Sequence, residues 1–546
     1  MRLNVAVVAG GGFQGQGIVE AIHAIPEARA IIVDSTADAI GELLADHYVQ
    51  APPLEPPEPF DEFLLELVSA ERIDLVVPAT QRELRRLALG AARLRQSGAR
   101  VAVCPPALLD VLLDKQALYG ALAQAGLPVQ ALVELGPAAP FPLFGRPRSG
   151  WGGRGNLRLD APEQLHAAGS EALAHSHAWV RFLEHFDEFS ADFAIDFEGR
   201  FSPVTLRRRV RTSGGFAVVS QSVDDADALA VVQRLGDWLC QQDACGLFNV
   251  QLLRTPDNQV WLSDINPRHG TSGGHALAEG NNLVAFLLGQ PGARARRAVR
   301  TFRPLRQQAV PLLPGTVRGL VFDLDDTLLD HKQWMLDRMA LASRQLADQV
   351  APDVLLAQTY VALEEGEHAR LIDVVAAGVG RVDLRDQLLA AYRASVPAQA
   401  VLYPDVLDVL GNLRRQGLRL ALLTDNPPAS QRAKIAAAPG LAEAFDVVVF
   451  TREHGAEKPA RAAFDMAAAG MGLAPDELVM VGDNPARDAM GAIAAGFASC
   501  LLVQRGGGRF QIHEELFARC APDVAARTWA APDLRVLPLA MRLAAT

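Results

Sequence analysis

Carboxylates gather after two apolar runs in the second half of the chain. One run is followed directly by Asp323, Asp325 and Asp326, and a later run, 478–481, leads to Asp483. Such runs predict buried parallel strands whose carboxyl ends open into a site. Because like charges held close together repel, carboxylates gathered at strand ends usually share a cation. We therefore predict a Mg²⁺ site with four carboxylate ligands: Asp323, Asp325, Asp483 and Asp488.

The same residue types could transfer a phosphoryl group to water. That reaction needs a nucleophile, a cation beside the phosphate oxygens and an acid for the leaving group. Asp323 could attack phosphorus and form an aspartyl phosphate, while Asp325 could act as general acid and then as general base. Thr424, at the end of another predicted strand, offers a hydroxyl and a backbone N–H to the phosphate. Lys458 offers a positive charge, and Asp488 could support either the cation or Lys458.

In order and context these residues resemble the motifs of the haloacid dehalogenase superfamily, over about residues 317 to 535. The resemblance implies a Rossmann-like hydrolase core with a helical cap, Mg²⁺ as the metal and phosphate-ester hydrolysis as the activity. It favours a phosphatase over a dehalogenase, because dehalogenation does not need an acid at Asp325. A relative that binds phosphate without turnover is the alternative. The four motifs lie at 323–327, 423–426, 457–459 and 482–488.

A glycine-rich loop follows a predicted strand in the first half of the chain. Arg146 lies just before this loop, and Gly152 and Gly153 belong to it. The backbone N–H groups of such a loop can close over a triphosphate while the guanidinium contacts the phosphates. The loop therefore predicts a nucleotide site.

Two later predicted strands carry oxygen ligands for a cation. Gln251 lies on the first strand, and Asp264 and Asn266 lie on the second. Three such oxygens on neighbouring strands suit Mg²⁺ that bridges the phosphates of ATP. Arg268, just beyond them, could stabilise charge on a transferred phosphoryl group.

Over about residues 1 to 290 the pattern resembles the ATP-grasp superfamily, and within it the large subunit of carbamoyl phosphate synthase. The resemblance implies that Lys115 belongs to the nucleotide-binding part, that Glu188 holds the ATP ribose and that the hinge at 180–183 lies beside adenine. Two positions depart from the family. Asp264 stands where a Glu ligand is usual, which shortens its reach by one methylene, and the hinge lacks the common Gln-Glu pair.

A second glycine-rich turn, 10–17, follows the first predicted strand, and Asp34 ends the next one. This spacing satisfies the dinucleotide-binding pattern, although any tight strand-to-helix turn also needs glycine. Under the ATP-grasp resemblance the turn belongs to a Rossmann-like domain that more often shapes the acceptor site than binds NAD. Thr80, Gln81 and Glu83 are then candidates for substrate contacts.

The length of 546 residues predicts several domains. We expect an α/β protein with a Rossmann-like domain at 1–105, an ATP-grasp domain at 106–290, a linker at 291–316 and a hydrolase at 317–546. A helical cap is expected at about 331–402, because helical periodicity follows the first hydrolase strand.

Composition excludes several classes of partner. The formal charge of −11 argues against nucleic acid and against a polybasic membrane contact. No stretch is long enough to span a bilayer, and the first residues do not form a signal peptide. The five cysteines show no metal-ligand spacing, so a reduced, cytoplasmic protein is expected.

Lysine is rare in this chain. Arginine supplies nearly all of the positive charge, which is typical of a mutational bias toward arginine codons. A lysine retained in such a background is of interest, and two of them fall inside the motifs above. The four are Lys115, Lys332, Lys434 and Lys458.

These patterns together predict a bifunctional enzyme. The ATP-grasp half would use ATP and Mg²⁺ to activate a small carboxylate as an acyl phosphate, which an amine or another nucleophile attacks. The other half would hydrolyse a small phosphate ester of the same pathway. Members of the ATP-grasp superfamily often dimerise, so a homodimer stays open. The alternatives are a nucleotide-sensing domain that regulates an active phosphatase, a non-catalytic scaffold that binds small molecules, and a dehydrogenase.

Overall fold

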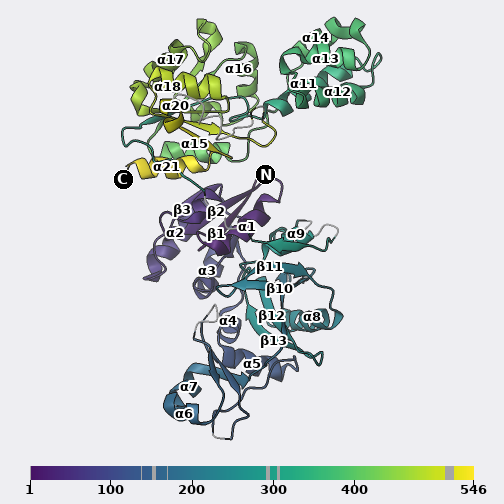
Figure 1. The fold of residues 1–546 in the computed structure, drawn as a ribbon, viewed down its shortest axis with the longest axis vertical. Helices are drawn as coiled ribbons and strands as arrows, with labels where there is room; N and C mark the ends of the chain where they lie inside the picture. Colours follow the sequence, from purple (N-terminus) through teal and green to yellow (C-terminus); the bar gives the residue numbers. More distant parts are fainter. Residues whose placement is uncertain are drawn as a thin grey trace. The chain divides into compact units, whose positions relative to one another are not determined.

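The chain forms two compact units in the computed structural model, Met1–Gln307 and Gln308–Thr546, and each is considered by itself (Figure 1). The division falls inside the predicted linker, of which 291–295 and 304–307 lie outside the described residues. The domain boundaries within each unit stay predictions. The structure describes residues 2–136, 138–150, 155–168, 170–290, 296–303, 308–508, 510 and 522–545.

The first unit begins with a parallel five-stranded sheet in the order β3-β2-β1-β4-β5. Its central strands are apolar on both faces, as expected for a parallel sheet with helices on each side. Val5 and Val7 pack into one core, and Ala6 and Val8 pack into another. The strands are β1 (Leu3–Val8), β2 (Ala28–Asp34), β3 (His47–Gln50), β4 (Leu75–Pro78) and β5 (Arg100–Val101). The helices are α1 (Phe13–His23), α2 (Pro57–Ala70), α3 (Leu84–Gln96), α4 (Pro106–Leu112) and α5 (Lys115–Gln124).

A small antiparallel sheet follows, in the order β7-β6-β8. Gly145 lies at its centre against the ring of Trp179, and any side chain at Gly145 would overlap that ring. The Trp179 ring therefore occupies the space that a side chain at position 145 would need. Its elements are β6 (Leu143–Pro147), β7 (Leu157–Leu159), β8 (His177–Arg181), α6 (Glu163–Ala168) and α7 (Ser170–Ser176).

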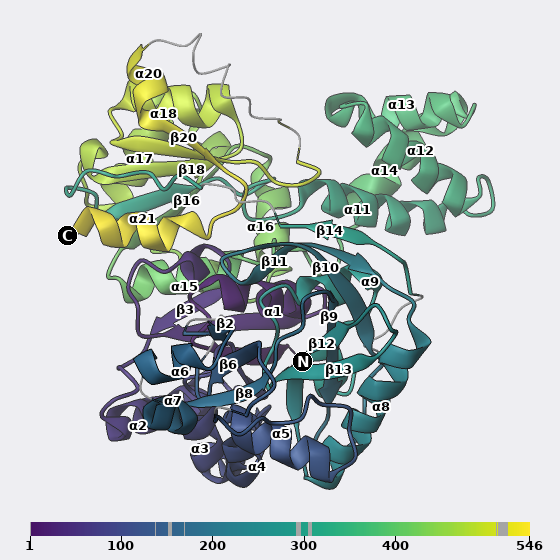
Figure 2. The same cartoon turned by 60° about the horizontal axis from the view of Figure 1, so that its bottom comes forward.

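The larger sheet of this unit has the order β13-β12-β9-β10-β11-β14. Alternation along β12 separates an apolar face from a polar one. Phe248, Val250 and Leu252 pack in one core with residues of helix α8, and Asn249 and Gln251 alternate with them along the strand. Figure 2 shows α8 beside β13 and β12. The strands are β9 (Asp187–Ile195), β10 (Thr205–Ser213), β11 (Phe216–Ser222), β12 (Gly246–Arg254), β13 (Val260–Asn266) and β14 (Arg300–Phe302). The helices are α8 (Ala226–Gln241), α9 (Gly274–Glu279) and α10 (Leu283–Leu287).

The second unit is built on a parallel sheet in the order β17-β16-β15-β18-β19-β20. Figure 1 shows α17 and α18 on one side of this sheet and α15 and α21 on the other. The strands are β15 (Gly319–Phe322), β16 (Arg419–Thr424), β17 (Val447–Phe450), β18 (Leu478–Gly482), β19 (Ser499–Val503) and β20 (Thr528–Ala531). The helices are α15 (Val406–Arg415), α16 (Pro428–Ala436), α17 (Arg461–Met471), α18 (Gly491–Ala495), α20 (Pro522–Arg527) and α21 (Val536–Ala545).

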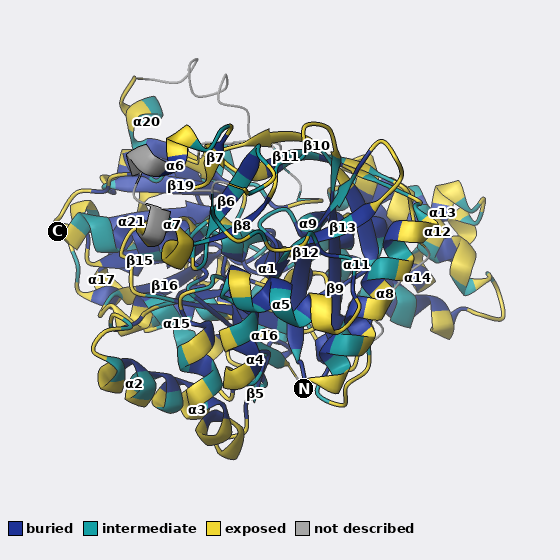
Figure 3. Ribbon diagram, turned by 90° about the horizontal axis from the view of Figure 1, so that it is seen from below, coloured by how far each residue is buried: buried dark blue, intermediate teal, exposed yellow. Residues whose placement is uncertain are grey.

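Four helices between β15 and β16 form a separate bundle (Figure 1). They bury their own apolar cluster, which includes Met339, Leu363, Val375 and Leu388. Their outer sides are largely exposed, whereas strands such as β9 and β12 are mostly buried (Figure 3). The helices are α11 (His331–Gln345), α12 (Pro352–Glu364), α13 (Leu371–Gly378) and α14 (Arg385–Ala394). This arrangement confirms a Rossmann-like core with a helical cap. Among the described residues, no helix combines the length and apolar character that crossing a bilayer would require.

Candidate active sites

Three adjacent strands of the second unit end at the same edge of the sheet. β16 and β18 flank β15 in parallel register, so the residues at their carboxyl ends meet there. Thr424 is the last residue of β16, Asp323 follows β15 and Asp483 follows β18. The backbone N–H of Asp323 donates to the carbonyl of Val481 at 2.8 Å, which fixes the start of the loop. The sheet thus gathers the residues that the sequence placed at strand ends.

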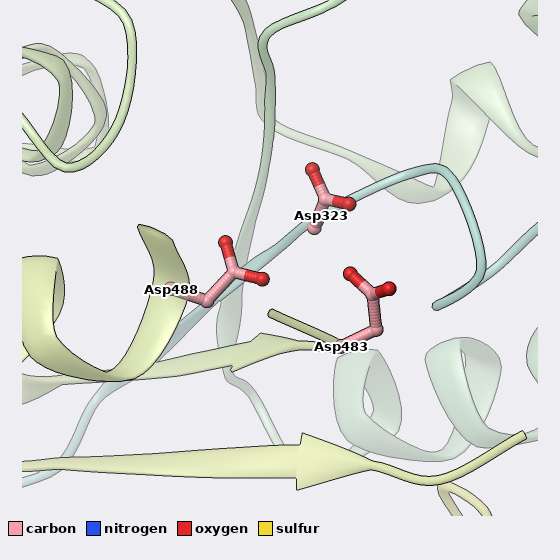
Figure 4. Close-up of side chains that lie close together, drawn as sticks. All are labelled: Asp323, Asp483 and Asp488. Carbon is pink, nitrogen blue, oxygen red and sulfur yellow. The ribbon is translucent and has the colours of Figure 1, made fainter. Parts of the chain in front are cut away.

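Asp323, Asp483 and Asp488 form a carboxylate cluster at this edge (Figure 4). One oxygen of each lies within 4.8 Å of one oxygen of each of the others. Asp488 reaches the cluster from the π-helical turn Pro485–Met490. Gly482 makes room for it, because a Cβ atom at that position would overlap the Asp488 carboxylate. The Asp488 carboxylate can therefore occupy this place only while residue 482 is glycine.

Electrostatics favour a cation within this cluster. Burial raises the pKa of Asp323, against the opposing effect of Lys458 and with the help of Asp488. Burial, and then repulsion from Asp323 and Asp488, raises the pKa of Asp483. Without a cation such carboxylates hold protons instead. Hard oxygen donors at this spacing fit a divalent cation such as Mg²⁺, which these three residues could hold.

Lys458 contacts two members of the cluster, one of which is the predicted nucleophile. Its Nζ atom donates to Asp323 Oδ1 at 2.7 Å and to Asp488 Oδ1 at 2.7 Å. Burial lowers the pKa of Lys458, but Asp323 and Asp488 outweigh that effect and raise it. The side chain is therefore a fixed positive charge at the floor of the site.

The structure differs from the sequence prediction at Asp325. Its carboxylate is not part of the cluster within the described residues, so its predicted role as a metal ligand through the side chain is not supported. Asn426 and Gln431 donate to its Oδ2 atom at 2.6 and 2.9 Å, and Lys434 pairs with its Oδ1 atom. The physical reason is that β15 ends at Phe322, so strand alternation no longer sets the direction of Asp325.

Asp325 is held as a carboxylate by its neighbours. Burial raises its pKa, but Lys434 and His331 outweigh burial and hold the pKa well below its usual range. Sequence reasoning missed Gln431, Lys434 and His331, although the rarity of lysine and the Gln-x-x-Lys spacing on one helical turn were signals.

One cavity of about 980 Å³ joins the carboxylate edge to the cap. On the cap side, Trp334, Arg338 and Tyr392 line it. The cavity is large enough for a small phosphorylated molecule. The sequence-predicted residues that line it are Asp323, Asp325, Thr424, Lys458, Asp483 and Asp488.

In the first unit, the predicted ATP ligands share one face of the large sheet. Gln251 and Asp264 are cross-strand neighbours, and Asn266 follows two residues after Asp264. Residues in these positions point to the same side of antiparallel strands. Arg268 lies beside them, with its Nη2 atom 3.5 Å from Asn266 Oδ1.

Asp264 also meets two of the predicted nucleotide-binding cations. Lys115 Nζ pairs with its Oδ1 atom, and Arg146 Nη2 lies 3.3 Å from its Oδ2 atom. Burial raises the pKa of Asp264, but Lys115 and Arg146 lower it to about 2. The carboxylate thus lies between two cations and is ionised. Gly152 and Gly153, the predicted phosphate loop, lie outside the described residues.

Two further predicted residues border this face. Glu188, on β9, forms an ion pair with Arg209 and also acts electrostatically on Arg146. Arg268 interacts electrostatically with Asp264 and with the buried Glu83, whose carboxylate accepts from Thr80 Oγ1 at 2.7 Å. Arg268 therefore links the ATP-ligand face to the candidate substrate contacts of the first domain.

The glycine turn at 10–17 uses its acidic residue internally. Asp34 Oδ2 accepts from the backbone N–H of Gly11 at 2.8 Å, and Oδ1 accepts from that of Thr36 at 3.0 Å. A Cβ atom on Gly11 would overlap Asp34. Asp34 closes the turn here, which is a different task from binding the ribose of a dinucleotide.

Comparison with known proteins identifies the second unit. The family model of haloacid dehalogenase-like hydrolases matches residues 317–496. Glyceraldehyde 3-phosphate phosphatase of Methanopyrus kandleri is 30% identical over 201 residues, which cover 35% of this chain and 85% of that protein. Phosphoglycolate phosphatase of Rhodospirillum rubrum is 32% identical over 191 residues, which cover 33% and 76% of the two chains. Phosphoserine phosphatase of Thermus thermophilus is 46% identical over 105 residues, 19% of this chain and only 41% of that relative.

Similar solved structures include an N5-carboxyaminoimidazole ribonucleotide synthetase in complex with ADP. It has a TM-score of 0.45 and 16% identity, and the match covers 55% of this chain and 81% of that one. The biotin carboxylase domain of a Hydrogenobacter thermophilus 2-oxoglutarate carboxylase has a TM-score of 0.44 and 12% identity, with coverages of 54% and 71%.

The family match and the relatives agree with the geometry of the second unit. The match contains all four motifs, and the phosphatases of Methanopyrus kandleri and Rhodospirillum rubrum are covered over most of their length. The predicted hydrolase half is thereby confirmed, and the chain belongs to the haloacid dehalogenase-like hydrolases.

Proposed function

We propose that the unit Gln308–Thr546 is a Mg²⁺-dependent phosphatase for a phosphate monoester of a small metabolite. The observation that carries this proposal is the contact of Asp323 with Lys458 beside the carboxylate cluster, at the floor of a cavity that the cap covers. Phosphatases among the relatives support the same reaction class. Asp323, Asp483 and Asp488 would hold the metal, which supplies positive charge beside the phosphate oxygens.

The chain's own residues account for both halves of the reaction. Asp323 attacks phosphorus, the P–O bond to the alcohol breaks, and the leaving oxygen takes a proton from Asp325. Because Asp325 rests as a carboxylate, that proton enters with the phosphate monoanion. Water then attacks phosphorus of the aspartyl phosphate and gives a proton to Asp325, and the bond between phosphorus and Asp323 breaks, which restores Asp323. The departing phosphate takes the proton from Asp325, so Asp325 ends the cycle as a carboxylate. Lys458 and Thr424 contact the phosphoryl oxygens throughout.

A panel of phosphate monoesters tests this function. Phosphate release should require Mg²⁺ and should vanish in Asp323→Asn, which keeps the size of the side chain and removes the nucleophilic charge. Hydrolysis that survives this substitution would refute the assignment of Asp323.

We propose a second activity for the unit Met1–Gln307, an ADP-forming ligase of the ATP-grasp type. Three predicted oxygen ligands on one sheet face, with Lys115 and Arg146 at Asp264, support it. Gln251, Asp264 and Asn266 would hold Mg²⁺ with ATP. A carboxylate would then take the γ-phosphoryl group, leaving ADP, and an amine would displace phosphate to give an amide. A nucleotide-sensing domain that binds ATP without turnover is the alternative.

Measurement of ADP release with panels of acids and amines distinguishes the ligase from the nucleotide-sensing domain. Acceptor-dependent ADP supports the ligase, whereas tight ATP binding without ADP supports the sensor. We also propose a cytoplasmic location, because the described cysteines are all free thiols.

A further inference from the structure

Helix α16 fixes both oxygens of Asp325. Lys434 pairs with Oδ1, and Gln431, one turn earlier on the same helix, donates to Oδ2 at 2.9 Å. Gln431 also donates to the hydroxyl of Thr424. Two side chains of one helix therefore set the orientation of the proposed proton-transfer residue and of a phosphate contact.

Burial of the Lys434 ammonium group costs free energy that a purely structural role would not require. The side chain is 1% exposed, and a buried cation costs free energy that packed apolar groups would not. Lys458 already supplies the cation beside Asp323, so charge neutralisation of the nucleophile does not explain a second lysine. Arginine supplies nearly all of the positive charge in this chain, but the three donors of a lysine ammonium group can reach partners in different directions.

The second partner of Lys434 lies in the cap. Lys434 Nζ is 3.1 Å from Nδ1 of His331, the first residue of α11. The same Nδ1 atom lies 3.3 Å from Asp325 Oδ1, so His331 contacts both the lysine and the carboxylate. The backbone N–H of His331 donates to Asp326 at 3.2 Å. The first residue of the cap helix α11 therefore contacts the core at Asp325, Asp326 and Lys434.

We propose that Lys434 and Gln431 are positioning residues for proton transfer by Asp325. They hold its carboxylate toward the ester oxygen, and through His331 they make that orientation depend on the position of the cap. The inference rests on the proposed phosphatase function and deepens it. It assigns to helix α16 a role that none of the four motifs carries.

Leaving-group dependence distinguishes this role from a structural one. An alkoxide needs a proton to leave, whereas p-nitrophenolate does not, so misplacement of Asp325 penalises alkyl phosphates more. In Lys434→Met we expect the single-turnover rate of alcohol release from an alkyl phosphate to fall about 100-fold, the usual size of a general-acid contribution, with the substrate concentration for half-maximal rate nearly unchanged. For p-nitrophenolate release in the same single-turnover measurement we expect a loss below about tenfold. Single turnover is used because Asp325 also acts as base in the later hydrolysis of the aspartyl phosphate, which every substrate shares. Lys332→Met is the matched control, because Lys332 contacts Glu364 and the ring of Tyr360 in the cap.

A double-mutant cycle on the alkyl phosphate then tests whether Lys434 acts through Asp325. Lys434→Met should add no further loss in the background of Asp325→Asn. Additive losses, or an equal loss on both substrates, would overturn the inference. Should Lys434→Met melt at a lower temperature than wild type, Gln431→Met gives the same test without unpairing a charge, and an unchanged substrate ratio there overturns it. A wild type that hydrolyses no phosphate ester overturns the proposed function as well, whereas an active wild type with unaffected variants overturns only this inference.

Discussion

Lys458 Nζ lies 2.7 Å from Asp323 Oδ1, and both side chains are almost completely buried. Burial raises the pKa of Asp323, and Lys458 acts in the opposite direction, so the lysine favours the anion that the proposed nucleophile needs. The contact therefore connects the cation of one motif to the nucleophile of another, across the sheet edge.

Lys458→Met should remove this charge while keeping the length of the side chain. Asp323 would then hold a proton more readily, and the phosphate would lose a partner, so kcat/KM for phosphate release should fall by at least about 100-fold. Lys332→Met serves as the control with the same chemical change. A loss below about tenfold would mean that Lys458 does not support the nucleophile.

Gly482→Ala should disable the metal site through Asp488. The added methyl group overlaps the Asp488 carboxylate, which must move out of the cluster. We expect weaker Mg²⁺ binding by calorimetry, and a free energy of unfolding lower by about 1–3 kcal/mol. Gly411→Ala on helix α15 is the control, since its nearest neighbour would be a flexible arginine at 3.6 Å. Unchanged Mg²⁺ affinity in Gly482→Ala would show that Asp488 does not need this position.

Asp483→Asn should have opposite effects with and without metal. Without Mg²⁺ the substitution removes repulsion from Asp323 and Asp488, so the melting temperature should rise above that of wild type. With Mg²⁺ at 100 times its Kd, wild type should gain about 2.7 kcal/mol, whereas the variant should gain almost nothing. Thermal melting with EDTA and with Mg²⁺ measures both. Equal Mg²⁺ stabilisation of the two proteins would exclude Asp483 as a ligand.

Asp264→Asn tests the proposed ligase site. It removes the anion between Lys115 and Arg146 and one oxygen ligand of the ATP-bound cation, so acceptor-dependent ADP release should fall to background. Asp257→Asn, at an exposed position in the turn between β12 and β13, is the control. ADP release at the wild-type rate in Asp264→Asn would place the metal elsewhere.

The sequence predicted the strand-end residues because two local signals agree there. Asp323, Thr424 and Asp483 each follow an apolar run, and parallel strands bring such ends to one edge. Sequence could not place Gln431 and Lys434, because they lie inside a helix whose side chains meet the site only through tertiary packing. Nor could it set the direction of Asp325 once the strand had ended.

The first unit shows the same division between local and tertiary information. Alternation along a strand is a local pattern, so the sequence could predict which residues share a face. The structure places two of them, Gln251 and Asp264, as cross-strand neighbours. The contact of Lys115 with Asp264 joins residues far apart in the chain, and no local pattern contained it.

Trapping of a phosphorylated Asp323 tests the central claim most directly. Mg²⁺-loaded Asp325→Asn should form the aspartyl phosphate from p-nitrophenyl phosphate and hydrolyse it slowly, because the base is missing. After acid quenching, mass spectrometry should find the mass of one phosphoryl group on the peptide that contains Asp323, and hydroxylamine should remove it. A variant that releases p-nitrophenol in turnover while that peptide stays unmodified at every quench time would contradict the account.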